Sequence, residues 1–165
     1  LASAVSYRHK DSLRFRRGLN VVSLSQSTLG ESVMMQAGQN MPDFRLPNQD
    51  GKLKTLADYK GQWLVLYVYP KDDTPGCTIQ GQSFTKEKSA YEKAGVNVVG
   101  ISQDDVASHK FFCNKFSFNV ELLADVEAKL LTSLGVGQSE YKGTKYWDRT
   151  TFVIDGVGNV NDGKS

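Results

Sequence analysis

The fold is decided by the stretch Trp63-Leu-Val-Leu-Tyr-Val-Tyr69, which runs directly into Pro70-Lys-Asp-Asp-Thr-Pro-Gly-Cys-Thr78. The first seven residues are all apolar or aromatic, which predicts a strand buried on both faces. Pro70 has no N–H to donate, so the hydrogen-bond ladder of this strand ends there. Thr74 is a typical N-cap, with Pro75 at the first helical position. We therefore predict a buried strand, a short turn and a helix.

Cys77 falls in the first turn of that predicted helix. The unpaired N–H groups and the positive end of the helix dipole favour the thiolate over the thiol there. We expect the Pro75-Gly76 pair to leave the N-terminal side of the cysteine open to solvent and lined by backbone amides. The Thr74 hydroxyl lies three residues away, close enough to hydrogen-bond a molecule that approaches the sulfur. The alternative is that Cys77 is a small buried hydrophobic residue.

The remaining sequence alternates strand and helix patterns, which is typical of an α/β sheet with helices on its faces. A hairpin is expected around Asp50-Gly51, and a flexible loop over Gly135–Gly143. The expected strands are Phe44–Leu46, Lys52–Thr55, 63–69, Val96–Ile101, Glu121–Leu123 and Thr150–Ile154. The expected helices are Pro75–Lys93, one that follows a Ser102-x-x-Asp105 capping box and ends near Phe116, and Val126–Leu134.

The pattern Pro70-x-x-x-Thr74-x-x-Cys77 resembles the active-site signature of the peroxiredoxins, and its flanking residues are similar to those of the peroxiredoxin Q, or bacterioferritin-comigratory, branch. The resemblance covers residues 41–160. It implies a thioredoxin-like fold, with a central mixed sheet flanked by helices, and a thiol-dependent peroxidase acting on hydrogen peroxide and organic hydroperoxides. Further family motifs occur in the expected order: Met41-Pro-Asp-Phe44, Val99-Gly-Ile-Ser102, Leu122-Leu-Ala-Asp125 and Arg149-Thr-Thr-Phe-Val-Ile-Asp155.

Arg149 is the candidate that assists the sulfur. A guanidinium stays charged and offers several fixed N–H donors, so it favours a thiolate and stabilises the charge that develops as an O–O bond breaks. The alternative for an isolated arginine is a surface salt bridge. The resemblance also implies that Thr74 hydrogen-bonds the peroxide and that Pro70 shields the sulfur from water. Gln80 stands where relatives commonly carry glutamate.

Cys113 is the only other cysteine. Many relatives place a second cysteine five residues after the reactive one, but Gln82 occupies that position, which excludes the disulfide within one helix. Other members of the branch carry a resolving cysteine on the following helix, and Cys113 fits that placement. The implied cycle forms a Cys77–Cys113 disulfide after part of one or both helices unwinds, and thioredoxin or a similar dithiol reduces it. Alternatively, Cys113 only fills an apolar slot between Phe112 and Phe116.

Three other functional hypotheses remain open at this stage. If Cys113 is structural, the chain is a one-cysteine peroxidase resolved by an external thiol. A non-catalytic redox sensor or interaction protein could be built on the same fold. A thioredoxin-like electron carrier is disfavoured, because Gln80 occupies the place of the second cysteine in Cys-x-x-Cys.

The 165 residues divide by composition into residues 1–40, a leader, and residues 41–165, the domain. The leader holds seven serines and five Lys or Arg against two acidic residues, which indicates an organelle transit peptide or a disordered tail. By resemblance we expect a plastid, with a mitochondrion or the cytoplasm as alternatives. Because the chain begins at Leu1, we expect a longer precursor. Relatives continue past Asp155-Gly156 into another strand and helix, so the domain is expected to be cut short.

No cofactor, metal or nucleic acid is expected. The net charge is +2, of which the leader carries +3, so the domain lacks the basic field of a nucleic-acid binder. His9 lies in the leader, His109 is expected on a solvated helix face, and Asp72-Asp73 in an exposed turn. The longest apolar run is too short to span a membrane. The resemblance implies a monomer.

Overall fold

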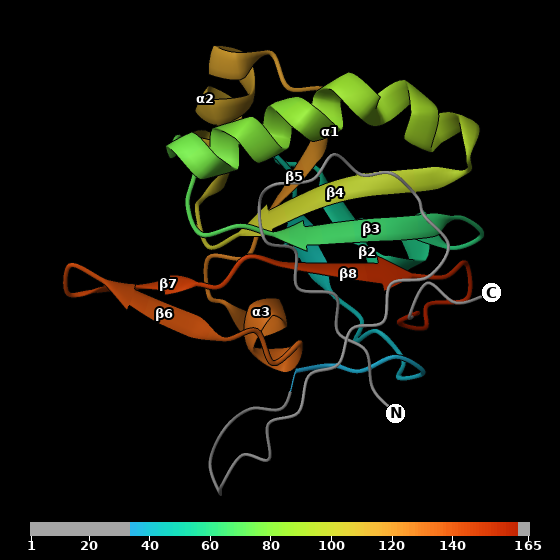
Figure 1. Cartoon of the computed structure of the whole chain (residues 1–165). Coiled ribbons are helices and arrows are strands. Elements are labelled where there is room, and N and C mark those ends of the chain that lie inside the picture. The colour runs from blue at the N-terminus through green and yellow to red at the C-terminus, as the bar shows by residue number, and fades with distance from the viewer. Residues whose placement is uncertain (1–33, 162–165) are drawn as a thin grey trace, which may run out of the picture.

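The computed structural model describes residues 34–161, and its centre is a four-stranded mixed sheet in the order β5-β4-β3-β8 (Figure 1). Strands β3, β4 and β5 run parallel, and β8 pairs antiparallel with β3. The four strands are β3 (Trp63–Val68), β4 (Val96–Ser102), β5 (Glu121–Ala124) and β8 (Thr150–Ile154). Together with the helices on both faces, this arrangement confirms the predicted α/β class and thioredoxin-like fold.

Strand β3 shows why the sheet is covered on both faces. Alternate residues of a strand point to opposite faces, and here both sets are apolar. Leu64, Leu66 and Val68 pack in one hydrophobic cluster, whereas Val65 and Tyr67 pack in another. Each face therefore has to be covered by further elements.

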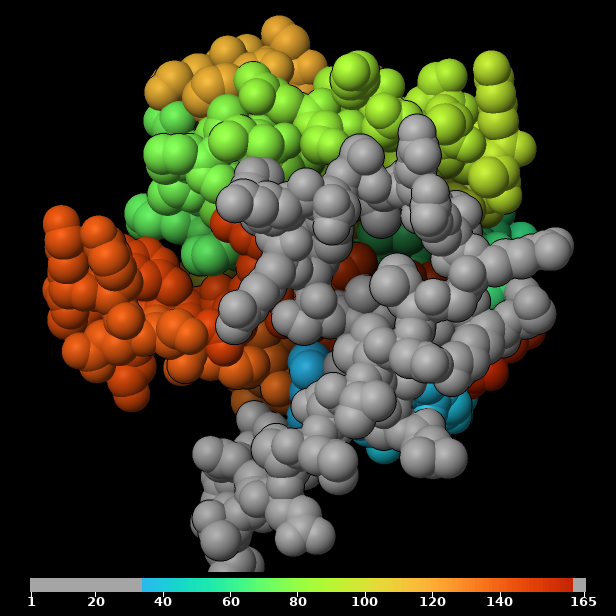
Figure 2. Space-filling model, in the orientation of Figure 1, coloured from blue at the N-terminus to red at the C-terminus, as the bar shows by residue number. Residues whose placement is uncertain are grey.

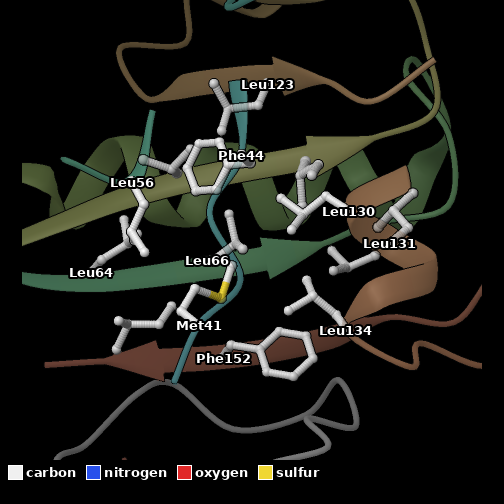
Figure 3. Close-up of a cluster of buried hydrophobic side chains, with 14 of the residues drawn as sticks. Met41, Phe44, Leu56, Leu64, Leu66, Leu123, Leu130, Leu131, Leu134 and Phe152 are labelled. Carbon is white, nitrogen blue, oxygen red and sulfur yellow. The ribbon is translucent and has the colours of Figure 1, made fainter. Parts of the chain in front are cut away.

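The first face is covered by a short helix and by the N-terminal part of the domain (Figure 3). Helix α3 (Lys129–Ser133) contributes Leu130 and Leu131, and Phe44 comes from the chain before β1. The other elements on this side are the antiparallel pair β1 (Arg45–Pro47) and β2 (Leu53–Thr55), and the 3-10 helix η1 (Leu56–Tyr59). Gly51 adopts a φ of 74° in the turn between β1 and β2, as the predicted hairpin requires.

The second face is covered by α1 (Pro75–Lys93) and α2 (Val106–Phe116), whose atoms form one continuous surface in Figure 2. Phe84 of α1 stacks on Tyr67, with ring centroids 4.5 Å apart. Phe112 of α2 is 1% exposed and packs edge-on against Phe118. Both cysteines belong to this cluster, so the packing of the two helices fixes where the thiols lie.

Three local expectations were wrong. The segment expected to be a loop over Gly135–Gly143 contains β6 (Gln138–Tyr141), which pairs with β7 (Thr144–Trp147) in a projecting hairpin (Figure 1). Ser102 ends β4 instead of capping a helix; Asp105 is the N-cap of α2 and accepts from the Ser108 N–H. Helix α3 is shorter than expected because Ala128 adopts a left-handed conformation, with a φ of 53°, just before it.

The described part of the chain begins within the segment that the composition assigns to the leader. Met34 and Met35 pack against the first cluster, and the Met35 N–H donates to the Leu134 carbonyl. Gly38 donates in the same way to Val160. The rest of the proposed leader lies outside residues 34–161. Within that range, no helix combines the length and apolar character that a membrane crossing requires.

Candidate active site

Cys77 lies at the third position of α1, the helix that follows β3 after a short turn. Thr74 is the N-cap residue and Pro75 the first helical residue, as predicted. The Thr74 hydroxyl makes no capping hydrogen bond to the helix; it donates to the Lys71 carbonyl at 2.9 Å. Cys77 is only 2% exposed, so the expectation that it is open to solvent was wrong. The first turn of α1 packs onto the Tyr67 and Tyr69 side of the sheet, and this packing buries the sulfur.

Arg149 reaches the sulfur from the far end of the sequence. It immediately precedes β8, and Thr150 of β8 is paired with Val68, the last residue of β3. The antiparallel register therefore brings Arg149 to the end of the sheet where α1 begins. Its Nη2 lies 3.4 Å from the Cys77 Sγ. A fixed positive charge thus stands beside the thiol, in addition to the helix N-terminus.

One neighbour of the guanidinium binds it and another leaves room for it. Nη1 donates to the side-chain oxygen of Gln80, a residue that is 8% exposed. Gly76 leaves the space for Nη2, because a Cβ built on it would lie 3.0 Å from that nitrogen. The partner of Arg149 is thus a neutral amide, which leaves its positive charge uncompensated by a carboxylate at this contact. Within the Pro75-Gly76 pair, Gly76 matters here because it leaves room for Arg149.

Pro70 and Thr74 bound the turn between β3 and Cys77. The ladder ends one residue before Pro70, where the Tyr69 N–H donates to the Ile101 carbonyl at 3.1 Å. Thr74 also accepts at its carbonyl from the Thr78 hydroxyl. Because the Thr74 hydroxyl uses its proton on Lys71, its oxygen retains lone pairs that can accept from a bound O–H group.

Cys113 lies on α2 and is buried, with 7% of its surface exposed. Both cysteines are free thiols. Burial raises the pKa of the Cys113 thiol to about 11, with nearby Asp72 and Asp50 adding to the effect. With α2 folded as in this structure, the Cys113 sulfur is therefore a protonated thiol at neutral pH. It shares the apolar cluster of Cys77, which is compatible with both the resolving and the slot-filling interpretations.

A buried polar network beside the site was missed from the sequence. His109 was expected on a solvated face and Asp72 in an exposed turn, but they are 0% and 7% exposed. His109 Nδ1 lies 2.7 Å from Asp72 Oδ2, and the Tyr69 hydroxyl donates to Asp72 Oδ1 at 2.6 Å. The available signal was helical spacing: His109 precedes Phe112 and Cys113 by three and four residues, which places it on their face.

With this geometry established, the comparisons with known proteins assign the class. The AhpC/TSA family model matches residues 37–162. The chain is 41% identical over 130 residues to a putative peroxiredoxin bcp of Coxiella burnetii, covering 77% of this chain and 86% of that one. It is 45% identical over 123 residues to the chloroplastic peroxiredoxin Q of Triticum aestivum, covering 74% of this chain but 56% of that protein.

A solved structure agrees. The bacterioferritin comigratory protein of Xanthomonas campestris, studied for its alkyl peroxide reduction activity, superposes with a TM-score of 0.69 at 32% identity, over 76% of this chain and 84% of that one. The chain therefore belongs to the AhpC/TSA family. Within that family its relatives are peroxiredoxins of the Q and bcp type, and the chain is accordingly an enzyme of the thiol peroxidase class.

Proposed function

We propose that Cys77 is the peroxide-reducing residue of a thioredoxin-dependent peroxiredoxin, and that Cys113 resolves it. The observation that carries the proposal is the 3.4 Å contact between Arg149 Nη2 and Cys77 Sγ at the first turn of α1. Helix dipole and guanidinium act in the same direction, since both stabilise a negative sulfur. The first role of Arg149 is thus to stabilise the thiolate.

In the first step, the Cys77 thiolate attacks the terminal oxygen of a hydroperoxide. An S–O bond forms, the O–O bond breaks, and the departing oxygen takes up a proton to leave as water or an alcohol. Arg149 stabilises the charge that moves from sulfur to the departing oxygen. Thr74 accepts a hydrogen bond from the peroxide O–H, and Pro70 shields the sulfur from bulk water.

In the second step, the Cys113 sulfur attacks the sulfenic acid. The S–S bond forms as the S–O bond breaks, and hydroxide leaves with the thiol proton as water. Disulfide geometry requires Cα atoms roughly 4.4 to 6.8 Å apart. The two residues lie on different helices, so part of one or both helices is proposed to unwind. Unwinding also exposes a thiol whose pKa burial raises to about 11. A dithiol of the thioredoxin class then returns both cysteines to thiols.

The test is a coupled assay that follows peroxide consumption with thioredoxin, thioredoxin reductase and NADPH. We expect turnover with hydrogen peroxide and with an alkyl hydroperoxide, and none with Cys77→Ser. A Cys113→Ser variant that loses turnover with thioredoxin but keeps a single round of peroxide reduction supports the resolving role. Full turnover of Cys113→Ser favours the one-cysteine enzyme. No turnover of the intact chain favours the redox sensor.

The location and assembly of the protein are further parts of this proposal. We propose that residues 1–40 include a plastid transit sequence, because they are rich in serine and arginine and because the wheat relative is named chloroplastic. A fusion of residues 1–40 to a fluorescent protein tests this, since plastid fluorescence is expected.

A monomer is proposed for the domain, and sedimentation analysis of the reduced protein checks it.

A further inference from the structure

The cluster formed by Asp72, His109, Tyr69 and Ser108 joins the segment of one cysteine to the helix of the other. Asp72 lies in the turn between β3 and α1, five residues before Cys77. His109 lies on α2, one helical turn before Cys113. The side chains of Asp72 and His109 are 4% and 0% exposed. The contact is therefore buried, and neither residue takes part in the proposed reaction of Cys77 and Cys113.

The polar atoms of the pair all have hydrogen-bond partners. The Leu123 carbonyl lies 3.0 Å from His109 Nε2 and can only accept, so that nitrogen carries a proton. Asp72 accepts from the Tyr69 hydroxyl at one oxygen and from the Ser108 hydroxyl, at 2.8 Å, at the other. His109 Nδ1 lies 2.7 Å from Asp72 Oδ2, so a buried hydrogen bond joins the two side chains.

The surroundings hold this arrangement in place. Burial and the neighbouring carboxylate raise the pKa of Tyr69 well above its ordinary value, so its hydroxyl remains a donor. The Asp72 N–H donates to Asp104 Oδ2 at 2.9 Å, and the Ser102 hydroxyl donates to the same oxygen. The turn before Cys77 is thus tied to the end of β4 and to the start of α2 by buried or half-buried contacts.

Helix α2 depends on this contact more than a longer helix would. It has eleven residues, and isolated helices shorter than about 12 to 15 residues are marginal in water. Only three of its residues are buried: His109, Phe112 and Cys113. Of these, His109 is the one that is hydrogen-bonded to the turn before Cys77. Removing one member of a buried hydrogen-bonded pair leaves a polar atom of the other unsatisfied, which disfavours the state in which α2 is folded over the site.

We propose that the hydrogen-bonded Asp72–His109 pair is the latch that keeps α2 folded over the Cys77 site, and that opening this latch gates the release of Cys113 for disulfide formation. The link to turnover rests on the proposed function, whereas the latch itself does not. A strong latch lengthens the life of the sulfenic acid, during which a second peroxide can oxidise it to the sulfinic acid. Asp72 and His109 are positioning residues in this account.

The molecule offers a matched control. Lys115, six residues after His109 on the same helix, pairs with Asp73, the neighbour of Asp72, at 2.7 Å. The two side chains are 44% and 38% exposed, so this ion pair joins the same two segments at the surface. Exposed pairs contribute little to stability. Lys115→Ala therefore removes a contact between the same elements without leaving a buried polar group unsatisfied.

The experiment measures how fast a disulfide reagent such as DTNB labels Cys113 in a Cys77→Ser background. We expect Asp72→Ala and His109→Ala each to label at least about tenfold faster than the parent, and the double variant to exceed the faster single variant by less than about threefold. Lys115→Ala should stay within about twofold. Ser108→Ala removes one donor to Asp72 and should give a milder increase in the labelling rate. It serves as the test variant if either alanine variant fails to fold. Folded variants that label at the parent rate, or single effects that multiply in the double variant, would overturn the latch.

The consequence for turnover is measured separately with Cys77 intact. After a peroxide pulse, His109→Ala should form the Cys77–Cys113 disulfide faster and contain less sulfinic acid than the parent and Lys115→Ala. Slower disulfide formation or more sulfinic acid in His109→Ala would overturn the gating role. If the parent itself forms no disulfide, the resolving role of Cys113 fails, while the labelling rates still decide whether the latch exists.

Discussion

The Arg149 guanidinium lies 3.4 Å from the Cys77 sulfur although 72 residues separate them in the chain. The pairing of β8 with β3 creates this contact, because Thr150 lies opposite Val68 at the end of the sheet. The site is therefore a product of the sheet register as much as of the Pro70-x-x-x-Thr74-x-x-Cys77 segment. Changes that move β8 relative to β3 should weaken the site even when they leave that segment intact.

Arg149 should dominate the peroxide step. We expect Arg149→Gln to lower the second-order rate constant for peroxide roughly 10²- to 10³-fold, the range typical of losing a donor to a developing charge. Arg149→Lys should recover part of the rate, because it keeps the charge without the planar fork. Stopped-flow tryptophan fluorescence measures the constant. Arg45→Gln, at an exposed strand position, is the control. Equal rates for Arg149→Gln and the control would contradict this role.

Gly76 should act through the guanidinium. In Gly76→Ala, the new Cβ would meet Nη2 at 3.0 Å, so the guanidinium has to shift by a few tenths of an ångström. We expect the peroxide rate constant to fall roughly tenfold through lost positioning, with thermal stability nearly unchanged since alanine suits a helix. Gly156→Ala, whose Cβ would meet only ordinary contact distances of 3.4 Å or more, should react normally. A normal rate for Gly76→Ala would mean that Arg149 tolerates displacement.

Thr74 can be tested with two substitutions of similar size. We expect Thr74→Val to lower kcat/KM about tenfold, because the acceptor for the peroxide O–H is lost. Thr74→Ser keeps the hydroxyl and should remain near the parent. Steady-state peroxidase assays give both constants. Identical behaviour of the valine and serine variants would show that the hydroxyl takes no part.

Cys113 should be inert at neutral pH in the reduced protein. Its pKa is raised to about 11 by burial, so iodoacetamide should modify Cys77 first and Cys113 increasingly as the pH approaches 11. Quenched alkylation with mass spectrometry measures both sites. Rapid alkylation of Cys113 at pH 7 would contradict the buried thiol.

The same shift predicts the sign of a stability change. A thiol whose pKa is higher folded than unfolded stabilises the protein below the unfolded value and loses that contribution as the pH rises towards 11. Between pH 8 and pH 10.5, the urea midpoint should therefore fall more in the parent than in Cys113→Ala. An equal fall of the urea midpoint in both proteins would contradict the raised pKa of the Cys113 thiol.

The sequence predicted the sheet because its strands carry strong apolar patterns. Strand β8 and helix α1 have the predicted bounds, Thr150–Ile154 and Pro75–Lys93. The hairpin β6–β7 was missed because every residue of β6 is exposed and shows no alternation. Its turn depends on backbone conformation instead, with positive φ angles at Lys142 and Gly143. A strand that is held mainly by backbone hydrogen bonds to its partner gives little signal in the hydrophobic pattern of the sequence.

The site was predictable only in part for a similar reason. The candidate residues Cys77, Thr74 and Pro70 lie in one segment, and Arg149 was found through its motif. The Asp72–His109 pair joins residues 37 positions apart, and each alone is an ordinary surface residue type. Only the fold reveals that both are buried. The burial of Cys77 itself was missed because it depends on how α1 packs on Tyr67 and Tyr69.

The most direct test of the account is to treat the reduced protein with one equivalent of hydrogen peroxide and to map the product by mass spectrometry. We predict that Cys77 is consumed and that a Cys77–Cys113 linked peptide pair is recovered. A sulfenic or sulfinic acid on Cys77 together with a free Cys113 would support the role of Cys77 in reducing peroxide and contradict the resolving role of Cys113. Recovery of Cys77 as an unmodified thiol, with the peroxide still present, would contradict the central claim.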